Sequence, residues 1–172
     1  RSPYEPHRAA TPLELFFDLV FVVAIAQASA GLHHAAAENH LAAGLLAFGM
    51  AFFGIWWAWM NFTWFASAYD CDDVPYRLLV FVQMIGALIF TAGLESMAVG
   101  DLRLGVAGYV VMRLAMVTQW LRAARNDPER RATALRYAFG ITAVQLLWVA
   151  FLAVPPSAVV PGFFALVVME VL

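Results

Sequence analysis

Long apolar runs separated by short polar loops are the dominant pattern of this chain. The first five runs each have the roughly 20 residues that a ~30 Å hydrocarbon core requires. Barrel strands alternate over about ten residues, which these runs do not, so helices are the expected spanning elements. The pattern predicts an all-α, polytopic membrane bundle in a single domain, with spans at about 12–32, 41–66, 77–98, 104–123, 133–153 and 158–172.

Both ends of the sequence look abrupt. The sixth apolar run reaches the last residue after about 15 positions without a polar flank, and the first residue is arginine instead of methionine. We therefore expect the chain to be a piece of a longer protein, and its remaining C-terminal spans to be partners of this part.

Composition narrows the class further. Hydrophobic residues make up 63% of the chain and charged residues 13%, whereas soluble domains carry roughly 25% charged residues. The net charge of -2 argues against a basic nucleic-acid-binding protein, and the single cysteine, Cys71, excludes an internal disulfide framework. The expected partner is the lipid bilayer, with a homo-oligomer left open, and no cofactor is expected.

Arginines gather on one side of the predicted membrane. Eight of the ten lie in the N-terminal segment and around the second and fourth loops, Arg103 lies on the opposite side, and Arg113 lies inside a span. Cytoplasmic loops are enriched in arginine, so we expect the N-terminus to be cytoplasmic.

The first predicted helix carries two acidic residues with different explanations. Thr11 and Glu14 form a capping box around Pro12, which gives Glu14 a structural role. Asp18 lies one turn further, on the same face, where an acid at the centre of a span costs about 2.5–3.5 kcal/mol. Asp18 is either a packing acid or part of an ion, proton or substrate site, and the two interpretations carry equal weight.

Arg113 lies at the midpoint of the fourth predicted span, where an arginine needs a partner. Asp18 is offset from it by only a few ångströms in depth, at 1.5 Å per residue. We hypothesise that Asp18 and Arg113 pair across the first and fourth helices, either as a structural contact or as a switchable site. Glu170 lies close to the end of the chain, and its depth is not defined by the sequence.

Other polar side chains recur within or beside the spans. Glu95 lies near the outer end of the third span and is interpreted as an interfacial acid or as part of an outer vestibule. The glutamines either bond neighbouring helices or line a polar path; they are Gln27, Gln83, Gln119 and Gln145.

An aromatic block ends the second span and is interpreted as an interfacial belt and packing surface; it comprises Trp56, Trp57, Trp59 and Trp64, with the polar Asn61. Asp70, Asp72 and Asp73 form an acidic corner in the following loop. They do not complete a calcium-binding loop, so no metal site is predicted.

Four blocks of residues carry a resemblance to a known family. They are PLELFFDLVFV at 12–22, which contains Phe16 and Phe17, WWAWMNFTWF at 56–65, the polar stretch at 69–77, and GYVVMR at 108–113. Together they resemble the bacterial low temperature requirement protein A (LtrA) family. The resemblance implies a longer multi-pass protein of the bacterial inner membrane, but it supplies no catalytic residues.

Two functions are consistent with these features. One is a transporter or channel that uses the intramembrane Asp18 and Arg113 together with the glutamines. The alternative is a non-transporting membrane protein that senses or organises during growth in the cold. An enzyme is not expected, since no nucleophile–base set is visible.

Overall fold

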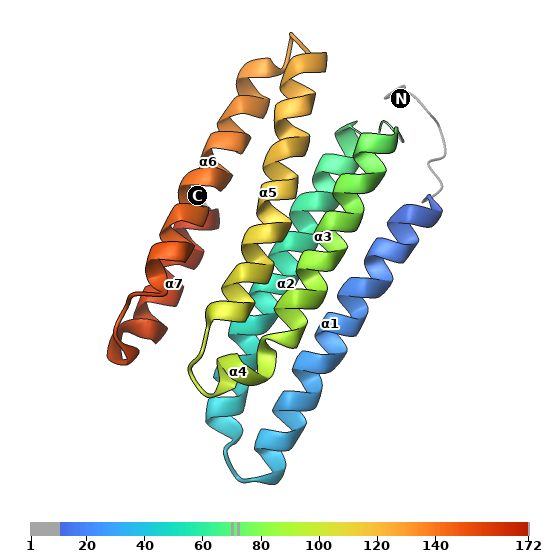
Figure 1. Cartoon of the computed structure of the whole chain (residues 1–172). Coiled ribbons are helices and arrows are strands. Elements are labelled where there is room, and N and C mark those ends of the chain that lie inside the picture. Colours follow the sequence, from blue (N-terminus) through green and yellow to red (C-terminus); the bar gives the residue numbers. More distant parts are fainter. Residues whose placement is uncertain (1–10, 70, 72, 172) are drawn as a thin grey trace.

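The fold is a bundle of helices joined by short connections (Figure 1). A computed structural model describes residues 11–69, 71 and 73–171 of the chain. The described part contains no strand, and its helices are α1 (Pro12–Ala37), α2 (Leu41–Tyr69), α3 (Val74–Ala92), α4 (Leu94–Ala98), α5 (Arg103–Asn126), α6 (Arg131–Phe151), the 3-10 turn η1 (Pro156–Ala158) and α7 (Val159–Val171).

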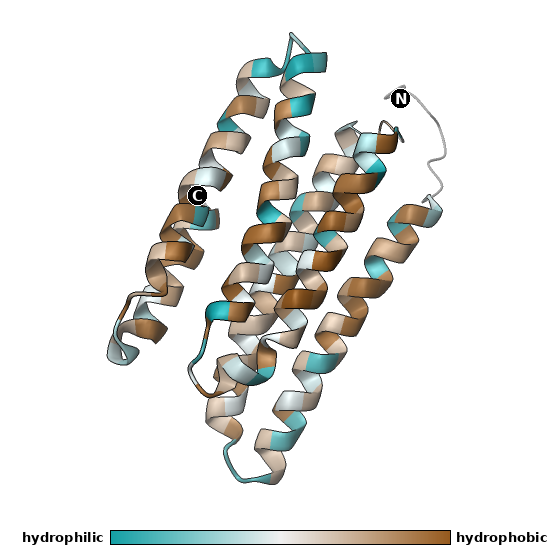
Figure 2. Ribbon diagram, viewed as in Figure 1, coloured by the Kyte–Doolittle hydropathy of each residue, from teal (hydrophilic) through white to brown (hydrophobic). Residues whose placement is uncertain are grey.

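Five of these helices (α1, α2, α3, α5 and α6) are long and apolar enough to cross a membrane, which confirms the predicted class. Brown, apolar ribbon runs along their length in Figure 2, and much of the teal, polar ribbon lies at the helix ends. The sixth predicted span is a shorter apolar helix in the described residues. The third prediction was too long, because the chain breaks at Gly93 and α4 follows as a separate short helix.

Successive long helices run in opposite directions, so the connections alternate between two ends (Figure 1). The α2–α3 and α5–α6 connections lie at the end near Thr11, and the described arginines of the predicted cytoplasmic side lie around them. Arg103 begins α5 at the opposite end. The segregation of arginines is therefore confirmed, while the assignment of the Thr11 end to the cytoplasm stays a prediction.

Glycines hold α3 and α5 close together. A methyl group on Gly108 would meet the backbone nitrogen of Phe90 at 2.3 Å, and one on Gly93 would meet that of Gly105 at 2.6 Å. Only glycine allows two backbones to approach this closely, as is common between membrane helices. This contact makes α3 and α5 the tightly packed centre of the bundle.

The helix α7 folds back along α6 after a turn at Pro155 and Pro156 (Figure 1). The ring of its buried Phe163 packs against Trp148 of α6 and Phe53 of α2, with ring-centroid distances of 5.5 Å and 6.1 Å. These contacts direct one face of α7 into the bundle and place the end of α7 about halfway along α6, which brings Glu170 to the bundle interior.

Candidate functional site

A buried ion pair joins α5 to α7. Nη2 of Arg113 lies 2.8 Å from Oε1 of Glu170, and the two side chains are only 3% and 2% exposed. Two opposite charges taken out of water cost several kcal/mol each unless close pairing and further hydrogen bonds compensate. Arg113 therefore has its counter-ion on α7, in the chain's last described turn.

Two aromatic side chains complete the hydrogen bonding of Glu170. The Tyr109 hydroxyl donates to Oε1 at 2.6 Å, and the Trp148 indole Nε1 donates to Oε2 at 2.9 Å. Cζ of Arg113 also lies 5.6 Å from the centroid of the Tyr109 ring. Each carboxylate oxygen thus has at least one donor, as expected of a buried charge. We call Tyr109, Arg113, Trp148 and Glu170 the charged cluster.

The depth match between Arg113 and Glu170 follows from helix geometry. Both α5 and α7 start at the same end of the bundle, at Arg103 and Val159. Arg113 lies ten residues into α5 and Glu170 eleven residues into α7, which corresponds to about 15 and about 16 Å at 1.5 Å per residue. The Pro155–Pro156 turn is the feature of the sequence that indicates this depth, because it marks where α7 re-enters the bundle.

Two nitrogens of the Arg113 guanidinium donate no hydrogen bond within the described residues. Its Nε and Nη1 atoms are buried and have no hydrogen-bond partner among the described residues. A buried donor without a partner costs about 1–3 kcal/mol, more when it is charged. Arg113 is therefore only partly satisfied by Glu170.

Gln145 lies at the same depth on the neighbouring helix. Two ring pairs fix how α6 lies along α5. The ring centroids of Tyr109 and Trp148 are 5.8 Å apart, and those of the stacked Trp120 and Tyr137 are 4.5 Å apart. This antiparallel register places Arg113 opposite residue 144, next to Gln145.

Arg113 and Gln145 also lie on the faces of α5 and α6 that pack against each other. Arg113 shares the α5 stripe of Tyr109 and Trp120, and Gln145 shares the α6 stripe of Trp148. Gln145 is 4% exposed, and neither its amide nitrogen nor its amide oxygen has a partner in the described part of the chain. The α5–α6 interface thus presents unused donors and an unused acceptor at one level.

Asp18 does not pair with Arg113, so that hypothesis is wrong. Asp18 Oδ1 accepts a hydrogen bond from Nε1 of Trp59 at 2.7 Å. The predicted depth of Asp18 was correct. The helices α2 and α5 run parallel, and the contact of Phe65 with Trp120 puts Trp59, the partner of Asp18, level with residue 114 of α5. The predicted neighbour of Asp18 was wrong, because α1 packs mainly against α2 and α3. It lies at the opposite side of the bundle from α6 and α7 (Figure 1).

The other predicted polar residues do not converge on one site. Gln83 donates to Gln119 at 3.2 Å between α3 and α5, as an interhelical bond. Gln27 is exposed on α1, and Glu95 is exposed on α4 at the end of the bundle. Of the four glutamines, only Gln145 lies at the level of the charged cluster and on the face toward it.

The first-helix motif and the aromatic block have structural contacts. The capping box is confirmed, with Thr11 N–H donating to Glu14 and Glu14 N–H donating to Thr11. Phe17 is buried against Phe62, whereas Phe16 is exposed.

Within the aromatic block, Trp56 and Trp64 are exposed on the outside of the bundle. The same α2–α5 register puts Trp56 level with residue 111, near mid-depth, so Trp56 does not lie at the level of an interfacial belt. Asn61 donates back to the Trp57 carbonyl, and the buried Nε1 of Trp57 has no partner in the part described. Trp59 was missed as the partner of Asp18, because indole donors are not distinguished by sequence from belt residues.

The acidic corner is only partly described. Asp70 and Asp72 lie outside the described residues. Asp73 caps α3 by accepting from Tyr76 N–H and also accepts from Arg122 of α5. Asp73 is therefore engaged in joining two helix ends.

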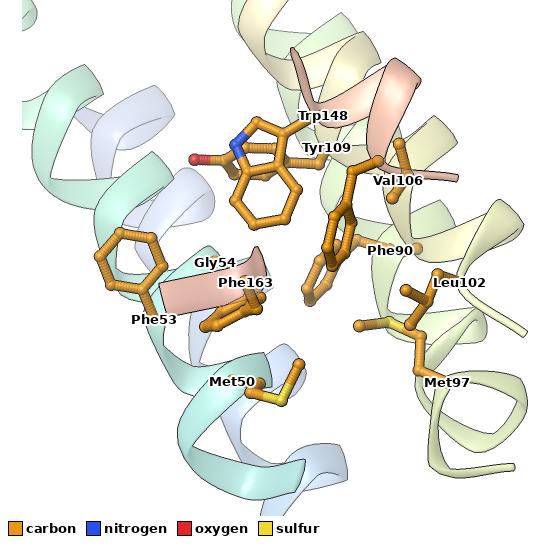
Figure 3. A pocket seen from close by; sticks show the side chains of 12 residues that line it. Met50, Phe53, Gly54, Phe90, Met97, Leu102, Val106, Tyr109, Trp148 and Phe163 are labelled. Carbon is orange, nitrogen blue, oxygen red and sulfur yellow. The ribbon is translucent and has the colours of Figure 1, made fainter. Parts of the chain in front are cut away.

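A small apolar cavity of about 30 Å³ adjoins the charged cluster on the side of α4 (Figure 3). Tyr109 and Trp148 contribute to its lining, and their polar atoms are the ones that donate to Glu170. The remaining lining is apolar: Met50, Phe53, Gly54, Phe90, Met97, Leu102, Gly105, Val106, Phe151 and Phe163. A volume of this size has room for one or two waters, but the lining offers them few polar partners.

These features define the class: a multi-pass membrane helix bundle with a charged cluster buried between α5, α6 and α7. The family model for the bacterial low temperature requirement A protein (LtrA) matches residues 9–172, and the chain belongs to this family. The resemblance noted from the motifs is thereby confirmed.

One curated relative is the uncharacterized protein RA0937 of Rhizobium meliloti (strain 1021). It is 32% identical over 158 residues, which cover 90% of this chain and 37% of that protein. The chain therefore spans a little over a third of the relative's length. No solved structure matches the chain significantly.

Proposed function

We propose that this protein carries a small polar or ionic solute across the membrane, through a site centred on Arg113 and Glu170. The observation that supports this most is the buried ion pair itself, with two guanidinium nitrogens left without partners. Ionisable residues inside membrane domains are costly, and they commonly mark ion and substrate pathways. We propose transport and not catalysis, in the inner membrane of a bacterium.

The cavity below the cluster suggests a route. It is bounded by Tyr109 and Trp148, which separate it from Glu170. A rotation of either ring would connect the cavity to the carboxylate. We propose that these two side chains gate access from the side of α4, and that the spans of the longer protein supply the rest of the path.

A second function is favoured by a different observation. Asp18 is bonded to Trp59, and the cavity lining is almost entirely apolar. Both fit a non-transporting protein that uses its buried charges to hold helices together and that organises or senses the membrane. Flux measurements separate the two proposals.

The experiment measures the flux of radiolabelled solutes into liposomes that contain the full-length protein, because this readout also detects electroneutral transport. A panel of small anions, cations and amino acids is applied to wild type and to the paired variant Arg113→Met with Glu170→Leu. Replacing both charges by apolar side chains of similar size commonly preserves folding. Transport predicts a solute flux in the wild type that is lost in the folded double variant. Absence of flux above that of protein-free liposomes, from well-folded wild type and for the whole panel, would contradict transport and support the second function.

A further inference from the structure

Arg113 retains the chemistry for a second carboxylate. A guanidinium is a planar fork whose N–H edges bind carboxylates in pairs. In this structure only Nη2 reaches Glu170, while Nε and Nη1 are buried and unpartnered. Both two-donor edges of the guanidinium, Nε–Nη2 and Nη1–Nη2, combine an unused nitrogen with the nitrogen that holds Glu170.

Gln145 adds a matching amide. Its side-chain nitrogen and oxygen are both buried without a partner, on the α6 face that holds Trp148 and at the level of Arg113. An unpartnered amide donor and acceptor, at the same depth as two unpartnered guanidinium donors and on the facing helix, favour a ligand that supplies its own oxygens. Each such group costs free energy until it is bonded, so binding would recover that cost.

Charge balance limits what can bind. Arg113 is already neutralised by Glu170, so an added anion would leave one uncompensated negative charge in an apolar bundle. Proton uptake by Glu170 removes this excess. The titratable and charged groups in contact with Glu170 are Tyr109 and Arg113 of α5, and its partner on α6 is the indole of Trp148, which does not titrate. Glu170 is therefore the group that can accept the proton.

We propose that Arg113, through its unused nitrogens, and Gln145 bind a small carboxylate anion, and that Glu170 takes up one proton from solvent when the anion binds. The net charge of the site then stays the same: the anion adds one negative charge and the proton removes one. This inference rests on the proposed function in one respect, since the bound anion would be the transported solute.

Isothermal titration calorimetry on the full-length protein in detergent tests the binding without requiring transport. The probe is acetate, the neutral isostere acetamide is the control for shape, and chloride is the control for a non-selective anion site. Titrations in two buffers of different ionisation enthalpy report the proton count. We expect acetate to bind with uptake of about one proton, and its affinity therefore to fall as the pH rises. Equal binding of acetate and acetamide, binding of chloride as tight as acetate, or no proton uptake would overturn the proposal.

Variants assign the roles. Gln145→Leu should weaken acetate binding at least fivefold, and its matched control is Gln27→Leu, since Gln27 is exposed on α1. Glu170→Gln should bind acetate without proton uptake and with no pH dependence. Arg113→Gln should abolish binding. Where Arg113→Gln fails to fold, the Glu170→Gln result still decides, because proton uptake that persists in that variant contradicts the proposal.

The two proposals can fail separately. Acetate binding with proton uptake but without solute flux into liposomes would leave the carboxylate site standing and contradict transport. Flux of another solute, with no acetate binding, would support transport and contradict the carboxylate site.

Discussion

Arg113 and Glu170 lie 57 positions apart in sequence and 2.8 Å apart in space, in side chains that are almost fully buried. The contact ties α7 to α5, and within the described residues the other polar bond between these helices is from the Tyr109 hydroxyl to the same carboxylate. The placement of α7 therefore depends on this cluster and on the contacts of the Phe163 ring with Phe53 and Trp148.

Removing one partner of the pair should destabilise the bundle strongly. Glu170→Ala leaves the Arg113 guanidinium buried without a counter-ion, and breaking such pairs costs about 3–5 kcal/mol. The control is Met169→Ala, because Met169 is a half-exposed neighbour on the outer face of α7. Unfolding of the full-length protein in detergent, followed by circular dichroism, measures the difference. Equal midpoints for the two variants would contradict a stabilising role for the pair.

A charge swap distinguishes the observed pair from the pair predicted by sequence. Arg113→Glu combined with Glu170→Arg should recover part of the folded yield that each single variant loses. Asp18→Arg combined with Arg113→Asp should recover none, because Asp18 bonds Trp59 on the other side of the bundle. Folded yield by size-exclusion chromatography reports both cycles. Recovery in the second cycle would show that Asp18 and Arg113 interact after all.

The Asp18–Trp59 bond should contribute modestly to stability. Trp59→Phe removes the indole donor, and hydrogen bonds to charged groups contribute about 1.5–3 kcal/mol. We expect the low end of this range, since Asp18 is only half-buried. Trp64→Phe is the matched control, because Trp64 is 60% exposed. A loss of unfolding free energy that is no larger for Trp59→Phe than for Trp64→Phe would refute the contribution of this bond.

Close packing of α3 on α5 should make Gly108 intolerant of any side chain. The methyl group of Gly108→Ala would lie 2.3 Å from the Phe90 backbone nitrogen, so the helices must separate. Gly140→Ala is the control, since nothing lies within 4 Å of its added methyl group. Helix propensity favours alanine there by roughly 0.5–1 kcal/mol. Thermal unfolding in detergent should therefore show opposite shifts for the two variants, and a stable Gly108→Ala protein would contradict the close approach.

The order of apolar and polar residues along the chain determines much of the helical architecture. Length and hydropathy of the runs predict the membrane helices, because the hydrocarbon core admits few alternatives for a polar backbone. The capping box at Thr11 and Glu14 was predictable for a similar reason, since both partners lie within one turn. The depth of Asp18 and Arg113 also followed from counting residues along the helices.

Only the tertiary structure decided which residues meet at that depth. Residue counting fixes the position along the membrane normal, but it does not say which helices are neighbours. Glycine packing brings α3 against α5 and leaves α1 at the other side of the bundle, so Asp18 meets Trp59. The return of α7 then brings Glu170 to Arg113. Partner choice in this bundle depends on lateral packing, and local sequence carries little information about it.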